Sequence, residues 1–388
     1  MEKNDFSDLD RSRKLILIYN TMRGDYIEYP THIIPDDFII STDRSLFTKA
    51  DAVLFYLPSL NEEIEDELEK PDGQLWIAWR TESEDDYPWV YLPEIAGMFD
   101  LWMGNRQYDD IKYPCTHPML QLCLKVKDKL KEEEQIKREA LALGDIFLCS
   151  FGDSRFPESR ERLVFQTSLF DLFKDIFVYN EHELNDSFRE RFKYQLRQEI
   201  RGFGYWVWKP HIILECLNKI NDNDVLLYID MGCHLNIRGK KRFLDYWSEI
   251  KKCKSGFLVT NLELDDYIEK RWTKGDVFDY FNVRDNPEIT HTPQYQASFL
   301  FIRKEQQTVD LIKKWLAVFY DDFCLVDDSP SVSPNLDGFN EHRHDQSVFS
   351  ILIKKHGASS IPINETYNHD WGALEAKYPV LIKRDFRR

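Results

Sequence analysis

Short apolar runs that alternate with amphipathic segments restrict the fold of this chain more than any other feature. In the first third of the sequence these runs lie at residues 14–19, 51–57 and 73–79. Runs of this length, bounded by polar and turn-forming residues, predict buried β-strands. Helix-like or turn segments separate the runs, so residues 1–117 are predicted to form a small α/β domain.

A second series of apolar runs follows Gly144. Strands are predicted at residues 145–151, 176–179, 224–230, 256–260 and 297–304. Apolar residues three and four apart predict helices between them, at residues 161–173, 188–200, 211–220 and 240–250. Residues 144–388 are therefore predicted to form a larger α/β domain. Between the two domains, residues 118–143 have helical spacing and no internal Pro or Gly, which predicts one long connecting helix.

The composition argues against several classes of protein. The formal net charge of −17 disfavours nonspecific nucleic-acid binding, because a polyanion is bound by a basic face. No stretch reaches the roughly 18 consecutive apolar residues that span a bilayer, and residues 1–10 lack the order of a signal peptide. The seven cysteines form no CxxC pair, which is typical of reduced thiols. We predict a cytosolic protein without an integral membrane segment, either in solution or peripheral to a membrane.

Asp230 ends a buried apolar run and is followed two residues later by Gly232. In open α/β sheets ligands bind beyond the carboxyl ends of the strands, so this carboxylate is expected to face a ligand crevice. Carboxylates are the hard ligands that Mg²⁺ and Mn²⁺ prefer, and such a cation would neutralise a nucleotide diphosphate. The alternative interpretation is that Asp230 only forms the turn before Gly232.

The segment at residues 201–215 combines positive charge, glycines and large aromatic rings. Pro210 suits the first turn of a helix, whose N-terminal N–H groups favour an anion. Cationic side chains would add to this attraction, and aromatic rings would form a wall for a base or sugar. A diphosphate or nucleotide site is predicted at Arg201, Gly204, Tyr205, Trp206, Trp208 and Lys209. The alternative is an aromatic corner of the core with a surface lysine.

A third cluster, at residues 341–357, places two histidines, Asp345 and Gln346 before an amphipathic helix. A carboxylate near a helix start is favoured as a cap, which alone would explain Asp345. The functional interpretation is that Asp345, with His344 or His342 beside it, orients or deprotonates a substrate hydroxyl.

Weaker candidates lie elsewhere in the second domain. His369 is predicted to complete a metal site beside Asp230. Gln294 and Gln296 are predicted to hydrogen-bond a sugar. The sequence contains no GxSxG, HExxH or GxxxxGKS pattern, which argues against the common hydrolases, zinc proteases and P-loop proteins.

Residues 47–106 resemble the N-terminal domain of family 10 α1,3-fucosyltransferases. The positions that match the family pattern are Gly73, Gln74, Trp76, Glu82, Ser83, Phe99, Asp100 and Arg106. In that family the domain helps to bind the acceptor, so the resemblance implies acceptor binding by Glu82, Ser83 and Arg106. The family's C-terminal donor signature, a Lys-Phe-x-Phe-x-x-Glu-Asn-like segment, does not occur after residue 144.

Residues 145–388 resemble bacterial and viral glycosyltransferases of the Rossmann-like A fold (GT-A) in surface-polysaccharide synthesis. The resemblance rests on FGDSR, RGFGYWVWKP, YIDMGC, TPQYQAS and EHRHDQS. It implies a donor site around Asp230 and residues 201–209, with Gly232, Gln294 and Gln346 also contributing. GT-A enzymes usually have a strand followed by Asp-x-Asp, and Gly232 stands here in place of the second Asp, so half of that metal motif is present.

Together these features predict a two-domain glycosyltransferase. It would move a sugar from a nucleotide-sugar donor, a UDP-sugar first among the candidates, to a hydroxyl of a glycan acceptor. Arg201, Lys209 and a cation at Asp230, Mn²⁺ or Mg²⁺, would stabilise the leaving diphosphate. Asp345 would act as base if the reaction inverts configuration, and would position a substrate if it retains configuration. The alternatives are a GDP-fucose-dependent fucosyltransferase and a noncatalytic glycan-binding protein with a decayed transferase domain.

Overall fold

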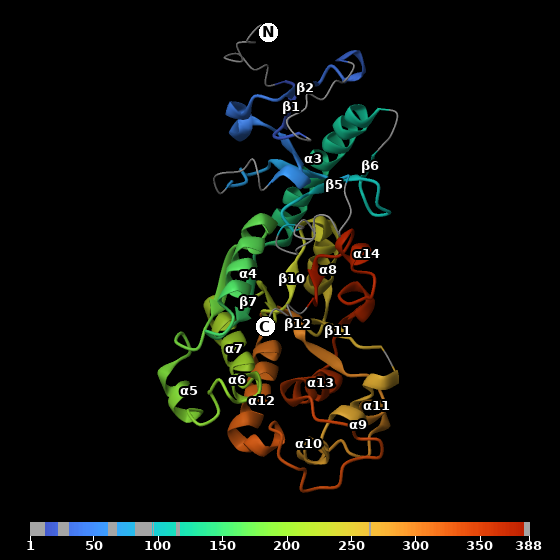
Figure 1. Cartoon of the computed structure of the whole chain (residues 1–388). Coiled ribbons are helices and arrows are strands. Elements are labelled where there is room, and N and C mark those ends of the chain that lie inside the picture. Colours follow the sequence, from blue (N-terminus) through green and yellow to red (C-terminus); the bar gives the residue numbers. More distant parts are fainter. Residues whose placement is uncertain are drawn as a thin grey trace. The chain divides into compact units, whose positions relative to one another are not determined.

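Parallel strands dominate the main sheets of both halves of the chain (Figure 1). The structure is a computed structural model that describes residues 12–21, 31–60, 68–81, 95, 97–113, 117–263 and 265–383. The chain divides into two units, Met1–Arg138 and Glu139–Arg388. The α/β class predicted for both halves is confirmed.

The first unit is built on a six-stranded parallel sheet with the strand order β2-β1-β3-β4-β5-β6. Its strands are β1 (Lys14–Ile18), β2 (Phe38–Ser41), β3 (Ala52–Tyr56), β4 (Leu75–Trp79), β5 (Leu101–Gly104) and β6 (Ile111–Lys112). Every residue of β3 and β4 is buried, because both faces of the sheet are covered. The apolar runs of the sequence therefore became the central strands of this sheet, whereas β2, β5 and β6 had not been predicted.

Helix α3 (Pro118–Leu143) follows this sheet. Its first turns pack on one face of the sheet through Met119, Leu122 and Val126. The division between the two units falls after Arg138, within the helix. Most of the helix that the sequence predicts as a connection thus belongs to the first unit, and its first half packs on the core of that unit.

The second unit has a mixed sheet with the strand order β13-β11-β12-β9-β7-β8. All strands run in one direction except β12, which is antiparallel to both neighbours. The strands are β7 (Ile146–Phe151), β8 (Asp175–Tyr179), β9 (Val225–Ile229), β11 (Phe257–Asn261), β12 (Tyr295–Arg303) and β13 (Ser359–Pro362). Two short strands, β10 (His234–Leu235) and β14 (Val380–Leu381), form a separate antiparallel pair.

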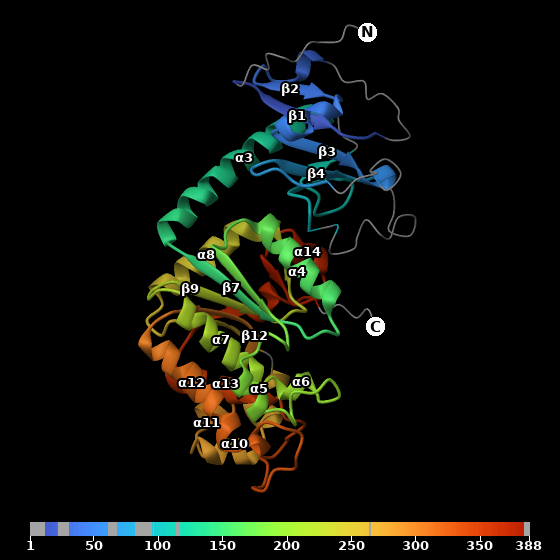
Figure 2. The same cartoon turned by 90° about the vertical axis from the view of Figure 1, so that its left-hand side faces the viewer.

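Helices cover both faces of this sheet (Figure 2). One face is covered by α7 (Trp208–Lys219), α12 (Gln306–Asp321) and α13 (His344–His356), which enclose a core with Leu226 and Tyr228 of β9. The other face is covered by α4 (Pro157–Phe170) and α8 (Lys240–Lys252), where Phe243 contacts Phe170 and Phe301. The remaining helices are α5 (Asp186–Arg191), α6 (Gly202–Tyr205), α9 (Glu269–Trp272), α10 (Gly275–Tyr280), α11 (Pro287–Thr290) and α14 (Trp371–Glu375).

The prediction of one helix over residues 188–200 is wrong. Helix α5 ends at Arg191, and turns follow to residue 200. Phe188 and Phe192 are buried and Leu196 packs against the core, but the backbone after Arg191 forms turns and Tyr194 is 72% exposed. A helix this short gains little from its own hydrogen bonds, which explains why it does not continue.

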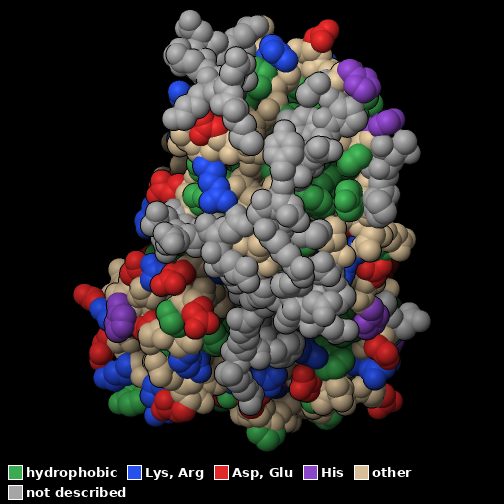
Figure 3. Space-filling view, turned by 45° about the horizontal axis from the view of Figure 1, so that its top comes forward, with side chains coloured by type: hydrophobic (Ala, Val, Ile, Leu, Met, Phe, Trp, Pro, Cys, Tyr) green, Lys and Arg blue, Asp and Glu red, His purple; other side chains and the backbone are tan. Residues whose placement is uncertain are grey.

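Charged side chains of both signs lie on the face of the molecule drawn in Figure 3. On the face drawn in Figure 3, Lys and Arg side chains lie interspersed with Asp and Glu side chains among the residues described there. This distribution differs from the basic face that binds nucleic acid. None of the helices that the structure describes combines the length and apolar character needed to cross a membrane.

Candidate functional site

A cavity of about 590 Å³ lies at the carboxyl ends of β7 and β9 in the second unit. Its walls come from five segments far apart in the sequence, within residues 151–159, 201–209, 230–233, 296–298 and 343–346, together with Ile382. Three of these segments contain the clusters on which the sequence analysis focused. The volume falls in the range of small-molecule sites, which are usually 300–1,000 Å³.

Asp230 lies one residue beyond β9 and lines this cavity. Side chains alternate along a strand, so Asp230 projects to the same side as Tyr228. The Tyr228 hydroxyl donates to Asp230 Oδ1 at 2.7 Å, and the Asp230 side chain is 34% exposed. The residue therefore presents a partly exposed carboxylate to the cavity, which is the placement that the crevice interpretation expects.

Lys209, in the first turn of α7, places its ammonium group between two carboxylates. Lys209 Nζ lies 2.7 Å from Asp345 Oδ2 and 3.2 Å from Asp230 Oδ1, and it donates to the carbonyl oxygen of Ala297 at 3.2 Å. Its side chain is only 3% exposed. Burial opposes the charge of Lys209, but Asp230 and Asp345 more than offset this effect and raise its pKa.

Asp345 is the buried member of this trio. It lies in the first turn of α13, where the N-cap residue is Arg343, and its carboxylate reaches Lys209 instead of capping the helix. Burial raises the pKa of Asp345 to about 6, because desolvation and the nearby Asp230 charge outweigh the attraction of Lys209. A carboxyl group with this pKa can exchange a proton near neutral pH.

Arg162 fixes the loop that follows Asp230. This buried arginine of α4 donates to the carbonyl oxygens of Met231 at 2.7 Å and Cys233 at 2.9 Å. Gly152 leaves room for the same loop, because a Cβ there would lie 2.9 Å from Met231 Cε. The backbone around Gly232 is thus held against the cavity by contacts with β7 and α4.

The backbone of residues 202–206 forms one turn of left-handed helix. All five residues have φ between 51° and 91°, and Tyr205 and Trp206 donate backbone hydrogen bonds to the residues four positions earlier. A left-handed conformation costs about 1–2 kcal/mol at each non-glycine residue, so surrounding contacts must maintain it. One such contact is Trp208 Nε1, which donates to the Gly202 carbonyl at 3.0 Å.

The left-handed turn of residues 202–206 places Trp206 in the wall of the cavity, which is rich in aromatic rings. The Trp206 ring lies against His344, with ring centroids 5.6 Å apart and a 28° interplanar angle. Phe151 stacks on Trp208 with centroids 4.1 Å apart. Trp206 and Trp208 line the cavity, whereas Gly204 and Tyr205 stand behind it and support the turn. Planar walls of this kind suit stacking with a base or a sugar face.

Arginines add positive charge to the cavity wall. Arg155 binds Asp153 through two hydrogen bonds of 2.7 and 2.8 Å. Arg201 lies 3.6 Å from Asp328, and Arg343 stacks over the Trp272 ring at 4.3 Å. With Lys209, these residues give the wall four cationic side chains against the three carboxylates of Asp153, Asp230 and Asp345. This balance differs from the net charge of −17 of the whole chain.

His344 and Gln346 line the cavity beside Asp345. His344 Nδ1 lies 2.8 Å from the Val326 carbonyl oxygen, and burial lowers the pKa of His344, so a neutral ring is favoured. Gln346 donates to Gln294 Oε1 at 2.9 Å. His342 is buried, and its ring centroid lies 5.4 Å from that of His344.

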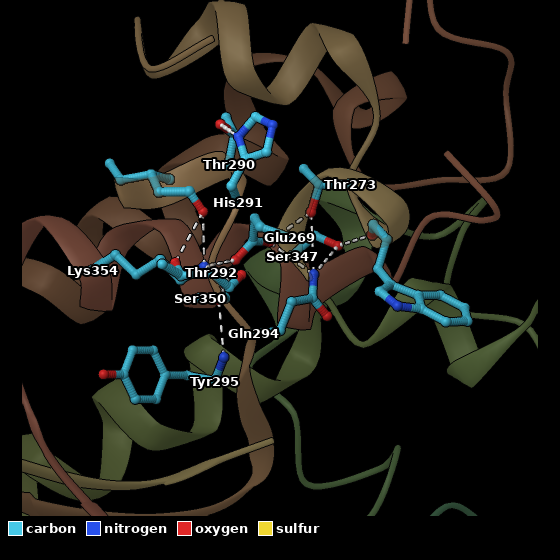
Figure 4. Close-up of polar contacts among 12 residues, drawn as sticks. Glu269, Thr273, Thr290, His291, Thr292, Gln294, Tyr295, Ser347, Ser350 and Lys354 are labelled. Atoms are coloured by element: carbon cyan, nitrogen blue, oxygen red, sulfur yellow. Dashed lines mark hydrogen bonds and ion pairs between the residues drawn. The ribbon is translucent and has the colours of Figure 1, made fainter. Parts of the chain in front are cut away.

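Gln294 occupies a different place from the one predicted for it. It is fully buried behind Gln346 and is absent from the cavity wall. Its amide donates to Glu269 Oε1 at 2.8 Å, to Thr273 at 3.1 Å and to Ser347 at 3.3 Å (Figure 4). We therefore correct the prediction: Gln294 orients Gln346 and does not face a donor sugar. Gln296, two residues further along, lines the cavity.

The metal site predicted at Asp230 and His369 has no support in the geometry. His369 is exposed, contacts the Tyr367 ring and does not line the cavity. Among the described residues, no three His, Cys, Asp or Glu side chains form a group able to hold a metal ion. The ammonium of Lys209 already lies between the oxygens of Asp230 and Asp345, so these residues do not fit a Mn²⁺ or Mg²⁺ ion as they stand.

The predicted acceptor residues belong to the first unit. Glu82 and Ser83 lie outside the described residues. Arg106 follows β5, and its backbone N–H donates to Asp109 Oδ2 at 2.8 Å. The same aspartate forms a buried ion pair with Arg80. Arg106 thus lies beyond the carboxyl end of a parallel strand, where ligands of such sheets usually bind.

Sequence reasoning did not single out the roles of Tyr228, Arg155 and Arg162. Tyr228 lies two residues before Asp230 on the same strand, so the alternation of side chains could have identified it. Arg155 is part of the FGDSR segment, whose Asp and Arg proved to be partners. The role of Arg162 could not be recognised from its sequence neighbours, because it depends on a loop about 70 residues away.

Comparison with known families extends the resemblance of the first unit. Residues 11–116 match the model of the family described as "Fucosyltransferase, N-terminal". The resemblance predicted from residues 47–106 is confirmed, and the match of residues 11–116 covers about three quarters of the first unit, Met1–Arg138. A search of curated proteins finds no match.

Three solved structures show a likeness to this chain. One is a glycosyltransferase involved in glycosylation of the major capsid of PBCV-1, with 11% identity, coverage of 63% of this chain and 94% of that chain, and a TM-score of 0.34. Mouse xyloside xylosyltransferase 1 has 11% identity, coverages of 65% and 92%, and a TM-score of 0.32. The galactosyltransferase LgtC has 11% identity, coverages of 61% and 86%, and a TM-score of 0.32.

Proposed function

We propose that this protein is a glycosyltransferase that transfers a sugar from a nucleotide-sugar donor to a hydroxyl group of a glycan acceptor. The observation that carries the proposal is the group formed by Asp230, Lys209 and Asp345, which lies in an aromatic-walled cavity beyond the carboxyl end of β9. The family match of residues 11–116 supports the same class of enzyme.

The cavity wall is suited to a nucleotide diphosphate. Its cationic side chains lie within an acidic protein and would attract an anion to this place. Trp206 offers its ring to the base or sugar, while Arg155 and Arg201 line the same cavity. Guanidinium groups match phosphate oxygens through paired N–H donors.

Asp345 is our candidate for the base in an inverting transfer. The acceptor oxygen forms a bond with the anomeric carbon, the bond from that carbon to the diphosphate oxygen breaks, and the nucleoside diphosphate leaves with the electron pair. The acceptor proton passes to Asp345, whose pKa of about 6 leaves it mostly ionised at neutral pH. The positive charge of the wall stabilises the negative charge that develops on the diphosphate.

The first unit is assigned to the acceptor. This assignment rests on the family match and on Arg106 at the end of β5. Under this proposal, Arg106→Ala raises the KM for the acceptor and leaves the affinity for the donor nucleotide unchanged.

A second candidate is a GDP-fucose-dependent fucosyltransferase, which the family match of residues 11–116 favours. Against it stands the absence of the family's donor signature after residue 144. The two candidates share the cavity and differ in the donor, so they are separated by the nucleotide that binds.

The test is thermal stabilisation of the full chain by UDP-, GDP-, CMP- and dTDP-sugars, compared with the Asp230→Ala variant. A ligand present at 100 times its Kd stabilises the folded state by about 2.7 kcal/mol, which raises the Tm by several degrees. Stabilisation by a UDP-sugar that is lost in Asp230→Ala supports the first candidate, and stabilisation by GDP-fucose alone supports the second. Glycan binding with no nucleotide binding would favour the noncatalytic alternative.

A further inference from the structure

Lys209 is a buried lysine that forms ion pairs with both Asp230 and Asp345 of the cavity. Its side chain is 3% exposed, and Nζ forms ion pairs with Asp345 Oδ2 at 2.7 Å and Asp230 Oδ1 at 3.2 Å and donates a hydrogen bond to the Ala297 carbonyl oxygen. Nζ also lies 5.4 Å from the centre of the Tyr228 ring. The ammonium of Lys209 therefore has two ion-pair partners and one hydrogen-bond acceptor within the protein.

The acceptors of Lys209 are the oxygens that a divalent cation would need. A Mg²⁺ ion binds carboxylate oxygens at about 2.0–2.1 Å, so an ion shared by Asp230 and Asp345 would occupy the space of the ammonium. Asp230 Oδ1 in addition accepts the hydrogen bond of the Tyr228 hydroxyl. Displacing Lys209 would bury its charge without partners, which is strongly unfavourable.

The second carboxylate of the cavity is supplied by a distant part of the chain. Gly232 occupies the position two residues after Asp230, so no acidic side chain is available there. Asp345 approaches instead from the start of α13, where its Oδ2 lies 2.7 Å from Lys209 Nζ. In this chain Asp230 and Asp345 both contact the ammonium of Lys209. In a metal motif, two such carboxylates would contact a metal ion instead.

We propose that Lys209 takes the place of the divalent cation in this site, as a built-in charge that holds Asp230 and Asp345 in position and makes nucleotide binding independent of Mn²⁺ and Mg²⁺. This inference rests on the proposed function, because it concerns the same cavity. Lys209 is a positioning residue in this scheme: it acts through the two carboxylates, while the arginines of the wall bind the phosphates.

The test compares the full-length protein with Lys209→Met, Lys209→Arg and the control Lys354→Met. Lys354 is also a buried lysine of the second unit paired with a carboxylate, Glu269, but neither residue lines the cavity. Two quantities are measured for each protein: the affinity for UDP and GDP in excess EDTA and in Mn²⁺, and Mn²⁺ uptake by electron paramagnetic resonance.

We expect the parent protein to bind its nucleotide equally well in EDTA and in Mn²⁺, and to take up no Mn²⁺ in the cavity. Lys209→Met leaves two carboxylates without a counterion, so this variant is expected to take up Mn²⁺ and to bind nucleotide at least about tenfold better with Mn²⁺ than in EDTA. Lys209→Arg keeps the charge and is expected to stay insensitive to EDTA. Lys354→Met is expected to resemble the parent in both measurements.

The inference fails if the parent takes up Mn²⁺ with its nucleotide and loses nucleotide affinity in EDTA; the proposed function would survive that result. If no nucleotide binds in either condition, the proposed function fails, and Mn²⁺ uptake by Lys209→Met but not by the parent would still support the cation role of Lys209. If Lys209→Met does not fold, the parent and Lys209→Arg in EDTA decide the question.

Discussion

Two buried lysines of the second unit show how differently the same pair of charges can be used. Lys354 donates to Glu269 Oε2 at 2.7 Å and to the carbonyl oxygens of Ile289 and Thr292 (Figure 4). Glu269 also accepts from Thr273, Gln294 and Ser350, so both of its oxygens are satisfied inside the protein. This network joins α9, β12 and α13 and leaves no group for a ligand.

Lys209 has similar burial but faces two carboxylates, one of which is 34% exposed to a cavity. The pKa values differ accordingly: burial lowers the pKa of Lys354 despite Glu269, whereas the two carboxylates raise that of Lys209 despite burial. The closed network around Glu269 stabilises the fold. The two carboxylates that share the ammonium of Lys209 lie next to a cavity and are available for chemistry.

The sharpest test of this comparison removes the buried carboxylate of the Lys209 group. Asp345→Asn is expected to lower kcat of the proposed transfer by about 10²–10⁴-fold, the usual contribution of a general base. Steady-state kinetics with the donor identified by thermal stabilisation measures the effect. An unchanged kcat of this variant would show that Asp345, like Glu269, has a structural role and is not the base.

The corresponding change in the closed network affects stability. Lys354→Met leaves the carboxylate of Glu269 buried without its counterion, which is expected to cost about 3–5 kcal/mol of the free energy of unfolding. Denaturant unfolding measures this loss, and activity per folded molecule is expected to remain that of the parent. Equal stability of parent and variant would contradict the role assigned to this network.

The pH dependence of transfer sharpens the comparison further. Asp345 has a pKa raised to about 6, so it is ionised above this pH and protonated below it. A protonated carboxyl group cannot act as a base, and kcat is expected to fall about tenfold for each pH unit below 6. The control is the residual activity of Asp345→Asn, which is expected to show no such step. A parent profile that stays flat down to pH 5 would exclude Asp345 as the base.

The aromatic wall is expected to contribute less. Trp206→Ala removes a stacking surface worth about 0.5–1.5 kcal/mol, which weakens nucleotide or donor binding by up to about tenfold. Isothermal titration measures the change, with Tyr194→Ala as a matched control because Tyr194 is 72% exposed and does not line the cavity. Equal affinities of the two variants would remove Trp206 from the donor site.

The smallest effect is expected at His369, which the sequence suggested as a metal ligand. His369→Ala removes an exposed side chain outside the cavity wall, so nucleotide affinity and its response to Mn²⁺ are expected to equal those of the parent. A loss of nucleotide affinity specific to Mn²⁺-containing buffer would restore His369 to the site.

Much of the fold and part of the candidate site could be predicted, because these features depend on local patterns. The buried strands before Asp230 and the helix at residues 118–143 follow from the apolar spacing of neighbouring residues. The position of Asp230 beyond the end of β9 follows from general properties of α/β sheets. The helix at residues 188–200 could not be predicted correctly, since its apolar spacing continues to Leu196, which packs against the core from outside helix α5.

The sequence by itself determined that this chain forms two α/β units, and it singled out the segments around Asp230, Lys209 and Asp345. Only the tertiary structure decided that Lys209 lies between the two carboxylates, that Gln294 points inward and that His369 points outward. The physical reason is that a pattern of neighbouring residues sets the backbone conformation, whereas the partner of a side chain depends on how distant elements pack. Lys209 and Asp345 begin two different helices, and only the packing of those helices on β9 and β12 brings their charges within 2.7 Å.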